Sequence, residues 1–338
     1  MNSIRKAYLW GYFFSMKRWI TVDDFTDLFV KMRQRGAKFF ISKANPNPIK
    51  RTKSAFDESA IHSANWWIVP AVRKRWNKLI SGHEDINYKQ KLMRDYLGDK
   101  ENLSLLSLGS GSCSHELELA AYPQFSDILC MDIAQNRLDR AAKIASEKNL
   151  NSIAFACKDI HKSDLGKEKW DVVLFNASLH HFYGVRELLE TKIKPALKSG
   201  GLLVINEYVG PDRLQYPMHQ IKAINRALQL IHEEKRIRFK TSLRKDRYYG
   251  SGWFRMIMAD PSECVNSSDI LPAIHSLFEV MEEMPYGGNI LMPALKDIAH
   301  HFQQEDEETS AILSNLFKFE DEFIKKYPTD FVFGVYSV

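Results

Sequence analysis

The chain has 338 residues, 45% of them hydrophobic and 26% charged, and a formal net charge of +5. That length can bury a substantial core and predicts one elaborated domain or two small ones. The composition is that of an ordinary soluble protein, and no apolar run approaches the roughly 20 residues needed to span a bilayer. The N-terminus lacks an apolar core followed by a small-residue cleavage site, so we expect a cytoplasmic location.

The four cysteines are scattered and form no CxxC pair and no His/Cys spacing suited to zinc. Cys130 and Cys157 fall in segments predicted to be buried strands, which favours reduced thiols. No Asp, Asn or His cluster has convincing metal-ligand spacing. The sequence therefore predicts no metal site.

Residues 1–53 form a basic arm, with twelve Lys and Arg against three Asp and with aromatic residues interleaved. Such an arm can pack on the protein body or on a second subunit, lie on an anionic membrane surface, or bind nucleic acid. Packing is the simplest of these readings, and a homo-oligomer through the arm and peripheral membrane contact stay open. The Asn-Pro-Asn-Pro run at 45–48 marks the end of the arm. Residues 54–100 are then expected to form a helical cap.

From residue 103 onward, short apolar runs alternate with segments of helical periodicity. The runs predict strands over 103–108, 127–132, 152–157, 171–176 and 200–206, with helices over 114–122, 135–148 and 184–196. This alternation implies a parallel sheet covered by helices on both faces. A ligand site is expected outside the carboxyl ends of the strands.

The first of these strands ends in a tight turn from Gly109 to Gly111, and a helical pattern follows. This arrangement lets backbone N–H groups approach an adenosine-type ligand. Twenty-one residues after Gly111 the second strand ends in Asp132, where a carboxylate can accept hydrogen bonds from ribose hydroxyls. The third glycine of the dinucleotide fingerprint is missing, with Cys113 in that region, which disfavours a pyrophosphate. The pattern predicts a nucleoside cofactor.

Three further segments follow in order, at 155–160, 170–181 and 197–207. Together with the glycine turn, their order and spacing resemble the class I S-adenosylmethionine-dependent methyltransferase family. The resemblance implies a Rossmann-like α/β fold with a seven-stranded, mostly parallel sheet and helices on both faces. It also implies S-adenosylmethionine as cofactor and S-adenosylhomocysteine as product.

By this resemblance, the glycine turn lies against the cofactor, Asp132 binds the ribose, Asp159 borders the adenine and Asn176 lines the methionine portion. The family usually has an acid two residues before the first glycine, and here that position is Ser107. Glu116 is a candidate to replace the lost contact. The expected cofactor-binding residues are Ser107, Gly109, Gly111, Asp132, Ile133, Asp159, Ile160, Asn176 and Ala177.

The acceptor side depends on residues after the fourth and fifth strands. His180 and His181 can accept the proton of an attacking hydroxyl or ammonium, although a histidine here in the family also packs or caps the next helix. A carboxylate at Glu207, followed by Tyr208, can orient the acceptor or take its proton. Which of the two histidines and Glu207 is the base stays open.

Residues 208–265 are predicted as a lid over the acceptor, since glycines beside aromatics suit a loop that closes and expels water. It includes a helix near 214–231. Its candidate acceptor contacts are Arg213, Tyr248 and Tyr249, and Trp67 of the cap joins them; Arg213 can instead fix the lid through a salt bridge.

The last two strands, an antiparallel pair in the resembled family, are expected at 278–281 and 331–336. Between them, an insertion over 287–328 is expected to hold helices near 289–303 and 309–326. The methyltransferase domain would thus span 101–338.

The sequence favours methyl transfer to oxygen or nitrogen of a small-molecule or carbohydrate-linked acceptor. The basic arm suggests a nucleic-acid methyltransferase as an alternative. However, the place of the Asn-Pro-Pro-Tyr element that grips a flipped base reads Asn-Ala-Ser-Leu at 176–179, which makes nucleic acid a poor candidate. A non-catalytic S-adenosylmethionine-binding scaffold, including one associated with a membrane, is the second alternative.

Overall fold

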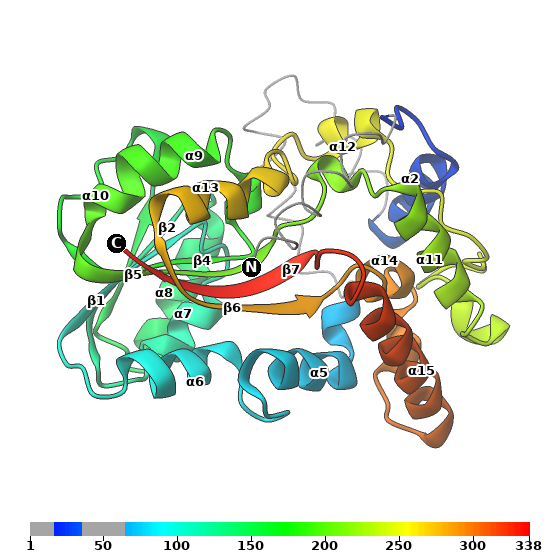
Figure 1. The fold of residues 1–338 in the computed structure, drawn as a ribbon, viewed down its shortest axis with the longest axis horizontal. Helices are drawn as coiled ribbons and strands as arrows, with labels where there is room; N and C mark the ends of the chain where they lie inside the picture. The colour runs from blue at the N-terminus through cyan, green and yellow to red at the C-terminus, as the bar shows by residue number, and fades with distance from the viewer. Residues whose placement is uncertain (1–16, 36–64) are drawn as a thin grey trace. The chain divides into compact units, whose positions relative to one another are not determined.

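A computed structural model describes residues 17–35 and 65–338 (Figure 1). The parts of the predicted arm and cap at 1–16 and 36–64 lie outside the described residues. The chain divides into two compact units. Of the described residues, the first contains 17–35, 65–78, 210–264 and 286–331, and the second contains 79–209, 265–285 and 332–338.

One seven-stranded sheet, with the strand order β3-β2-β1-β4-β5-β7-β6, occupies most of the second unit. Strands β1 to β5 pair in parallel along this order, and the sheet includes one antiparallel hairpin. The strands are β1 (Leu103–Leu108), β2 (Phe125–Asp132), β3 (Ile153–Cys157), β4 (Trp170–Asn176), β5 (Leu197–Tyr208), β6 (Glu279–Gly287) and β7 (Phe331–Ser337). The predicted Rossmann-like α/β fold is confirmed.

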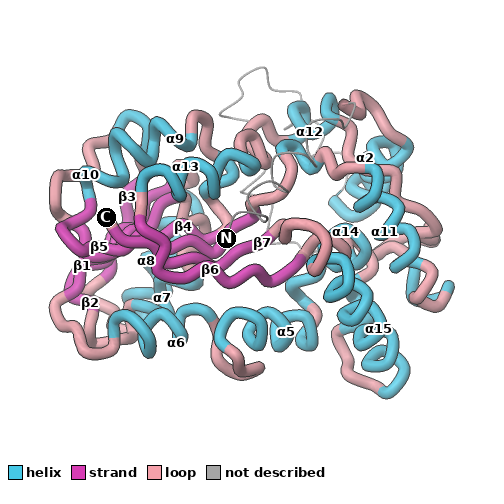
Figure 2. Tube along the Cα trace, viewed as in Figure 1, coloured by secondary structure: helices cyan, strands magenta, loops and turns pink. Residues whose placement is uncertain are grey.

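Helices cover both faces of this sheet, with α6, α7 and α8 on one side and α9, α10 and α13 on the other (Figures 1 and 2). All six residues of β1 are buried, as expected for a central parallel strand between two helical layers. The helices of this unit are α6 (Tyr88–Leu92), α7 (Ser114–Leu119), α8 (Gln135–Glu147), α9 (Val185–Leu188), α10 (Lys194–Ala196) and α13 (Ile270–Leu277).

The edge strand β3 corrects one prediction. Cys130 of β2 is buried, but Cys157 at the end of β3 is exposed, because no further strand pairs beyond β3. All four cysteines are free thiols. An apolar run at a sheet edge therefore does not bury every one of its side chains.

The first unit is mainly helical. Its helices are α2 (Val22–Arg35), most of α5 (Pro70–Ser81), α11 (Met218–Leu228), α12 (Trp253–Ala259), α14 (Leu291–Leu295) and α15 (Glu307–Ile324). An aromatic cluster joins its segments: the rings of Trp66 and Trp76 lie 4.5 Å apart, and that of Phe331 lies 5.1 Å from Trp66.

The helix predicted over 289–303 is wrong in extent, because α14 ends at Leu295 and only a 3-10 turn follows, Ala299–Phe302. The buried ammonium of Lys245 donates to the carbonyl oxygens of Pro293, Ala294 and Lys296 at 2.6–3.1 Å. The backbone leaves the helical region at Lys296, where ψ is 130°, and the ammonium satisfies carbonyls near the helix end that lack a partner within the helix. Burial lowers the pKa of this lysine to about 7.

Two buried carboxylates order the start of α14 and the entry to β7. Glu320 accepts hydrogen bonds from the backbone N–H groups of Gly288, Ile290 and Leu291. Asp330 accepts one from Gln220 at 2.7 Å, while its other oxygen has no hydrogen-bond partner. Burial therefore raises the pKa of Asp330 to about 8.

Within residues 17–35 and 65–338, no helix combines the length and apolar character that crossing a membrane requires.

The raised pKa of Asp330 predicts a pH-dependent stability. Between about pH 4 and pH 8 the folded chain holds a proton that the unfolded chain releases, so stability falls as pH rises through this window. Asp330→Asn removes the penalty, and since one pKa unit corresponds to about 1.4 kcal/mol, we expect the gain in stability to be roughly 4 kcal/mol larger at pH 8 than at pH 5. Thermal melts at both pH values measure the difference. An exposed control, Asp99→Asn, should leave the melting temperature unchanged at both pH values. An equal gain in stability at both pH values in Asp330→Asn would contradict the raised pKa of Asp330.

Candidate functional site

The carboxyl ends of β1, β2, β4 and β5 meet at one edge of the sheet. The pairing Leu108↔Met131 ends β1 beside β2, and Asn176↔Asn206 ends β4 beside β5. The loops that follow these strands carry most of the residues that the sequence singles out. This edge is the candidate site.

The turn after β1 is built for close backbone approach. Gly109 has φ +67° and Gly111 has φ +56°, in the left-handed region that favours glycine. A Cβ on Gly109 would lie 2.8 Å from the Cβ of Ser178, closer than side chains pack. The N–H of Gly109 donates to the carbonyl of Met131 at 2.8 Å, so β2 fixes the turn.

Asp132 ties this turn to the end of β2. One carboxylate oxygen accepts the N–H of Gly111 at 2.9 Å, and the other accepts the N–H of Ala134 at 2.8 Å. The side chain is mostly buried, and the next residue, Ile133, is half-buried. Each carboxylate oxygen can accept further hydrogen bonds, so the group is held in place and can still bind hydroxyls.

Ser107 replaces the family's acid and pairs with an acid from α7. Its hydroxyl donates to Glu116 at 2.7 Å, and both side chains are buried. Burial raises the pKa of Glu116. The carboxyl group of Glu116 thus lies beside the end of β1, where the resembled family has an acid and this chain has Ser107.

Cys113 lies just before α7 with φ +54°, in the backbone region that favours glycine. It lies in the region of the missing third glycine of the dinucleotide pattern, whose sixth position is Ser114. The left-handed turn is kept, although the residue type is not.

The remaining cofactor candidates line the same edge. Asp159 is half-buried and its carboxylate accepts the N–H of His161 at 3.1 Å, while Ile160 is buried. Asn176 accepts a hydrogen bond from the amide of Asn206 at 2.8 Å. Ala177 is exposed and has φ +48°, so β4 ends in a sharp turn.

Glu207 is fully buried and joins the end of β5 to the loop after β4. One oxygen accepts the backbone N–H groups of Ser178 at 2.7 Å and Leu179 at 2.6 Å. The other accepts the N–H of Tyr208 at 2.8 Å and pairs with Nδ1 of His180. Four donors on one carboxylate make Glu207 a residue that orders the loop.

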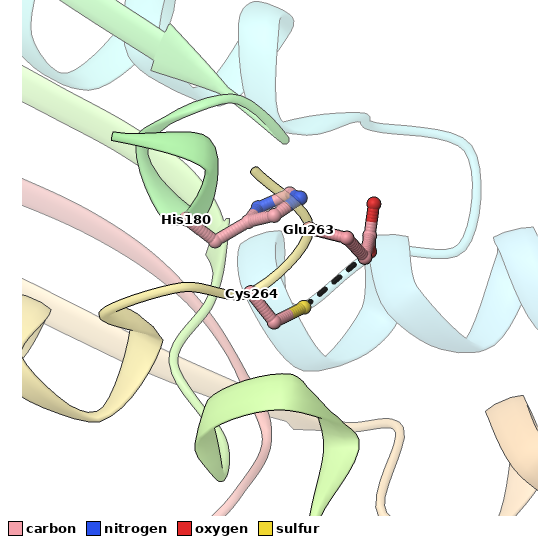
Figure 3. A group of neighbouring side chains, drawn as sticks. All are labelled: His180, Glu263 and Cys264. Carbon is pink, nitrogen blue, oxygen red and sulfur yellow. Dashed lines mark hydrogen bonds between the residues drawn. The ribbon is translucent and has the colours of Figure 1, made fainter. Parts of the chain in front are cut away.

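This pairing sets the state of the His180 ring, drawn in Figure 3. Because a carboxylate oxygen only accepts, Nδ1 carries the proton and Nε2 is the basic nitrogen of the neutral ring. The ring of His181 lies 4.2 Å from that of His180, and the buried ring of Tyr208 lies 6.2 Å from it. Sequence reasoning singled out Glu207 but assigned it no partner.

Four predicted acceptor residues belong to the first unit. Arg213 is buried, and its guanidinium donates to the carbonyls of Asp260 and Glu263 at 3.4 and 3.0 Å. Cys264, the next residue, donates to the Glu263 carboxylate at 3.4 Å (Figure 3). The arginine therefore organises the loop at 260–264.

The other three residues differ in exposure. Tyr248 is buried, whereas Tyr249 and Trp67 are partly exposed. Only the last two present large side-chain surfaces, and contact with an acceptor stays a prediction for all four.

One exposed group in the first unit brings potential metal ligands together, His232, Glu234 and Glu308. Glu308 pairs with His232 at 2.6 Å and with Lys235 at 2.9 Å. These ion pairs account for the cluster, and we assign no metal to it.

Comparisons with known proteins agree with this geometry. A family model described as a methyltransferase domain matches residues 99–307, more than half of the chain. No curated protein sequence matches the chain.

Among solved structures, a geranyl diphosphate C-methyltransferase from Streptomyces coelicolor A3(2) is 11% identical, with a TM-score of 0.50 over 88% of this chain and 99% of that one. It was solved with Mg²⁺, geranyl diphosphate and S-adenosyl-L-homocysteine. An S-adenosylmethionine-dependent methyltransferase from Mesorhizobium loti is 16% identical, with a TM-score of 0.42 over 75% of this chain and 99% of that one.

At these identities the solved structures show a shared fold alone, and the family assignment depends on the domain match and the ordered motifs. The chain belongs to the methyltransferase domain family, within the class I S-adenosylmethionine-dependent methyltransferases.

Proposed function

We propose that this chain binds S-adenosylmethionine at the carboxyl edge of its sheet and transfers the methyl group to an oxygen or nitrogen atom of a small-molecule or carbohydrate-linked acceptor. Family membership supports the reaction class. The observation that carries the choice of acceptor atom is the His180 ring, whose Nδ1 is held by the buried Glu207.

The residues at the edge fit the cofactor. Gly109 and Gly111 present backbone without side chains, and the carboxylate of Asp132 is held by two N–H groups with acceptor capacity left for ribose hydroxyls. Asp159 and Ile160 would border the base. Asn176 and Ala177 would lie along the amino-acid portion.

The cofactor, when bound, supplies an electrophilic methyl group on a positively charged sulfur. The protein's part is to align the acceptor and to exclude water. The buried strand ends and the rigid turns after β1 and β4 serve this alignment, because each turn is fixed by side-chain to backbone hydrogen bonds.

An oxygen or nitrogen acceptor also has to lose a proton. With Nδ1 protonated, the neutral imidazole of His180 can accept that proton at Nε2. Glu207 then acts as a positioning residue and not as the base, because its two oxygens already accept four hydrogen bonds.

The ribose assignment predicts the effect of Asp132→Ala. Loss of hydrogen bonds to a charged group costs about 1.5–3 kcal/mol, so S-adenosylmethionine and S-adenosylhomocysteine should each bind roughly 10- to 150-fold more weakly. Calorimetric titration of the full chain measures both affinities.

Asp127→Ala is the matched control, since Asp127 is exposed on the same strand. It should bind both compounds like the wild type. Wild-type affinity in Asp132→Ala, with the fold intact by circular dichroism, would refute our placement of the ribose. Absence of binding by the wild-type chain would instead favour a scaffold.

The positioning role predicts the effect of Glu207→Gln. Each oxygen of Glu207 accepts two hydrogen bonds, and in glutamine one of these oxygens is replaced by an NH₂ group that faces two donors. The His180 ring therefore loses its fixed tautomer or its orientation. Turnover should fall by about 100-fold or more, as for removal of the carboxylate that orients a catalytic histidine. Cofactor affinity should stay within about threefold, because Glu207 lies outside the residues that hold the cofactor.

Release of S-adenosylhomocysteine with a panel of hydroxyl and amine acceptors measures turnover, and nitrogen NMR of labelled histidine reports the tautomer. His180→Gln should show the same loss of turnover, whereas exposed Glu279→Gln should behave like the wild type. Full turnover in His180→Gln would show that His180 is not the base. A product methylated at carbon would overturn the choice of acceptor atom.

A further inference from the structure

Helix α2 of the first unit is amphipathic in the reverse of the usual sense. Its three acids, Asp23, Asp24 and Asp27, are all buried. Its large apolar side chains Phe25, Leu28 and Met32 are exposed, and Phe25 is 67% exposed. A surface helix ordinarily buries its apolar stripe and exposes its acids.

The buried acids hold α2 to the rest of its unit. Asp23 accepts the backbone N–H groups of Tyr249 at 2.6 Å and Gly250 at 3.0 Å. Asp24 accepts the N–H of Gly252 at 2.8 Å.

Side-chain cations complete the attachment of α2. Arg255 donates to Asp24 at 2.8 Å and pairs with Asp27 at 3.2 Å. Lys296 pairs with Asp27 at 2.6 Å. Although burial opposes it, these two cations lower the pKa of Asp27. The negative charges of the helix therefore face into the unit, where backbone N–H groups and two cations bind them.

The outward side forms one apolar surface with α12. The segment before α2 pairs with the start of α12, since the N–H of Trp253 donates to the carbonyl of Arg18 at 2.7 Å and the rings of Trp19 and Trp253 lie 5.1 Å apart. We call this surface the α2–α12 patch. Its exposed apolar residues are Trp19, Ile20, Val22, Phe25, Leu28, Phe29, Met32, Phe254 and Met258.

Cations border this patch. The ammonium of Lys17 lies 5.4 Å from the ring centre of Trp253, and the guanidinium of Arg33 lies 5.5 Å from that of Phe29. Both side chains are exposed. With the acids of α2 buried, the charge presented beside the apolar side chains is positive.

We propose that the α2–α12 patch docks on an anionic lipid surface, with α2 lying in the plane of the interface. Exposed Trp, Phe and Leu beside Lys and Arg are the side chains that insert at the boundary of headgroups and acyl chains while pairing with anionic lipids. A 14-residue helix is about 21 Å long, too short to span the hydrocarbon core and suited to lie on it.

Charge complementarity selects this occupant over a second copy of the chain. Two copies would bring like-charged borders together, which opposes association. An anionic bilayer pairs with the same cations. The inward ion pairs keep α2 in place, so the apolar side chains are already arranged for insertion.

The test is flotation of the full chain with phosphatidylcholine vesicles, prepared with and without phosphatidylglycerol. We expect binding to the anionic vesicles, weakening as salt is raised. The double variant Phe25→Ser/Leu28→Ser keeps every charge of the chain and alters only exposed side chains. It should bind anionic vesicles at least about tenfold more weakly, because two large apolar side chains no longer enter the lipid.

The matched control is Val280→Ser/Met281→Ser, which removes two exposed apolar side chains from β6 and should bind like the wild type. Binding that survives in Phe25→Ser/Leu28→Ser would mean that charge alone attaches the chain, and would overturn the proposal. A wild-type chain that ignores anionic vesicles would also overturn it. So would a dimer in light scattering that the same double variant abolishes while vesicle binding persists.

Discussion

The geometry of the candidate site depends on the buried carboxylate of Glu207. It gathers the N–H groups that open the loop after β4, and Ser178 of that loop donates its hydroxyl to the carbonyl of Leu108 at 2.7 Å. A Cβ on Gly109 would come within 2.8 Å of the Cβ of Ser178. One carboxylate thus orders the histidine loop and ties it to the end of β1, while the glycine turn itself is held by Met131 and Asp132. Leaving four donors unpaired in the interior would cost far more than one ordinary hydrogen bond, so this arrangement is strongly specified.

The strands could be predicted because each is a short apolar run between turn signals, and β1 was placed to the residue. The helix expected over 289–303 shows where periodicity fails. Its apolar spacing continues past Leu295, but the backbone leaves the helical region at Lys296, beside the carbonyls that Lys245 binds. Nothing local to the helix indicates a lysine some 50 residues earlier in the chain. Periodicity describes which side chains can share a face, and it contains no information on distant donors.

The same limit applies to the site. Asp132 was singled out because its distance from the glycine turn is local information. The role of Glu207 required contacts with residues 27 to 29 positions away, whose donors are backbone groups and a ring nitrogen. From sequence alone, a carboxylate at a strand end can equally well contact a substrate or accept hydrogen bonds from other groups of the protein. Ser107 is the intermediate case: a serine in place of the acid, with Glu116 only nine residues on, let the replacement be suspected, and the hydrogen bond joins the two.

Helix α2 shows why hydrophobic periodicity alone does not decide which face is buried. From its sequence, the helix could bury either its apolar or its acidic side. Which side is buried depends on residues 226 to 269 positions away that bind the aspartates. Burying three aspartates is costly unless each finds donors or cations, and the loop at 249–252, Arg255 and Lys296 provide them. Because breaking such buried pairs would leave uncompensated charge, the helix cannot simply rotate to hide its apolar side chains. The hydrogen bonds and ion pairs of the buried aspartates therefore keep the apolar side of α2 exposed. Docking on an apolar surface requires such a fixed orientation.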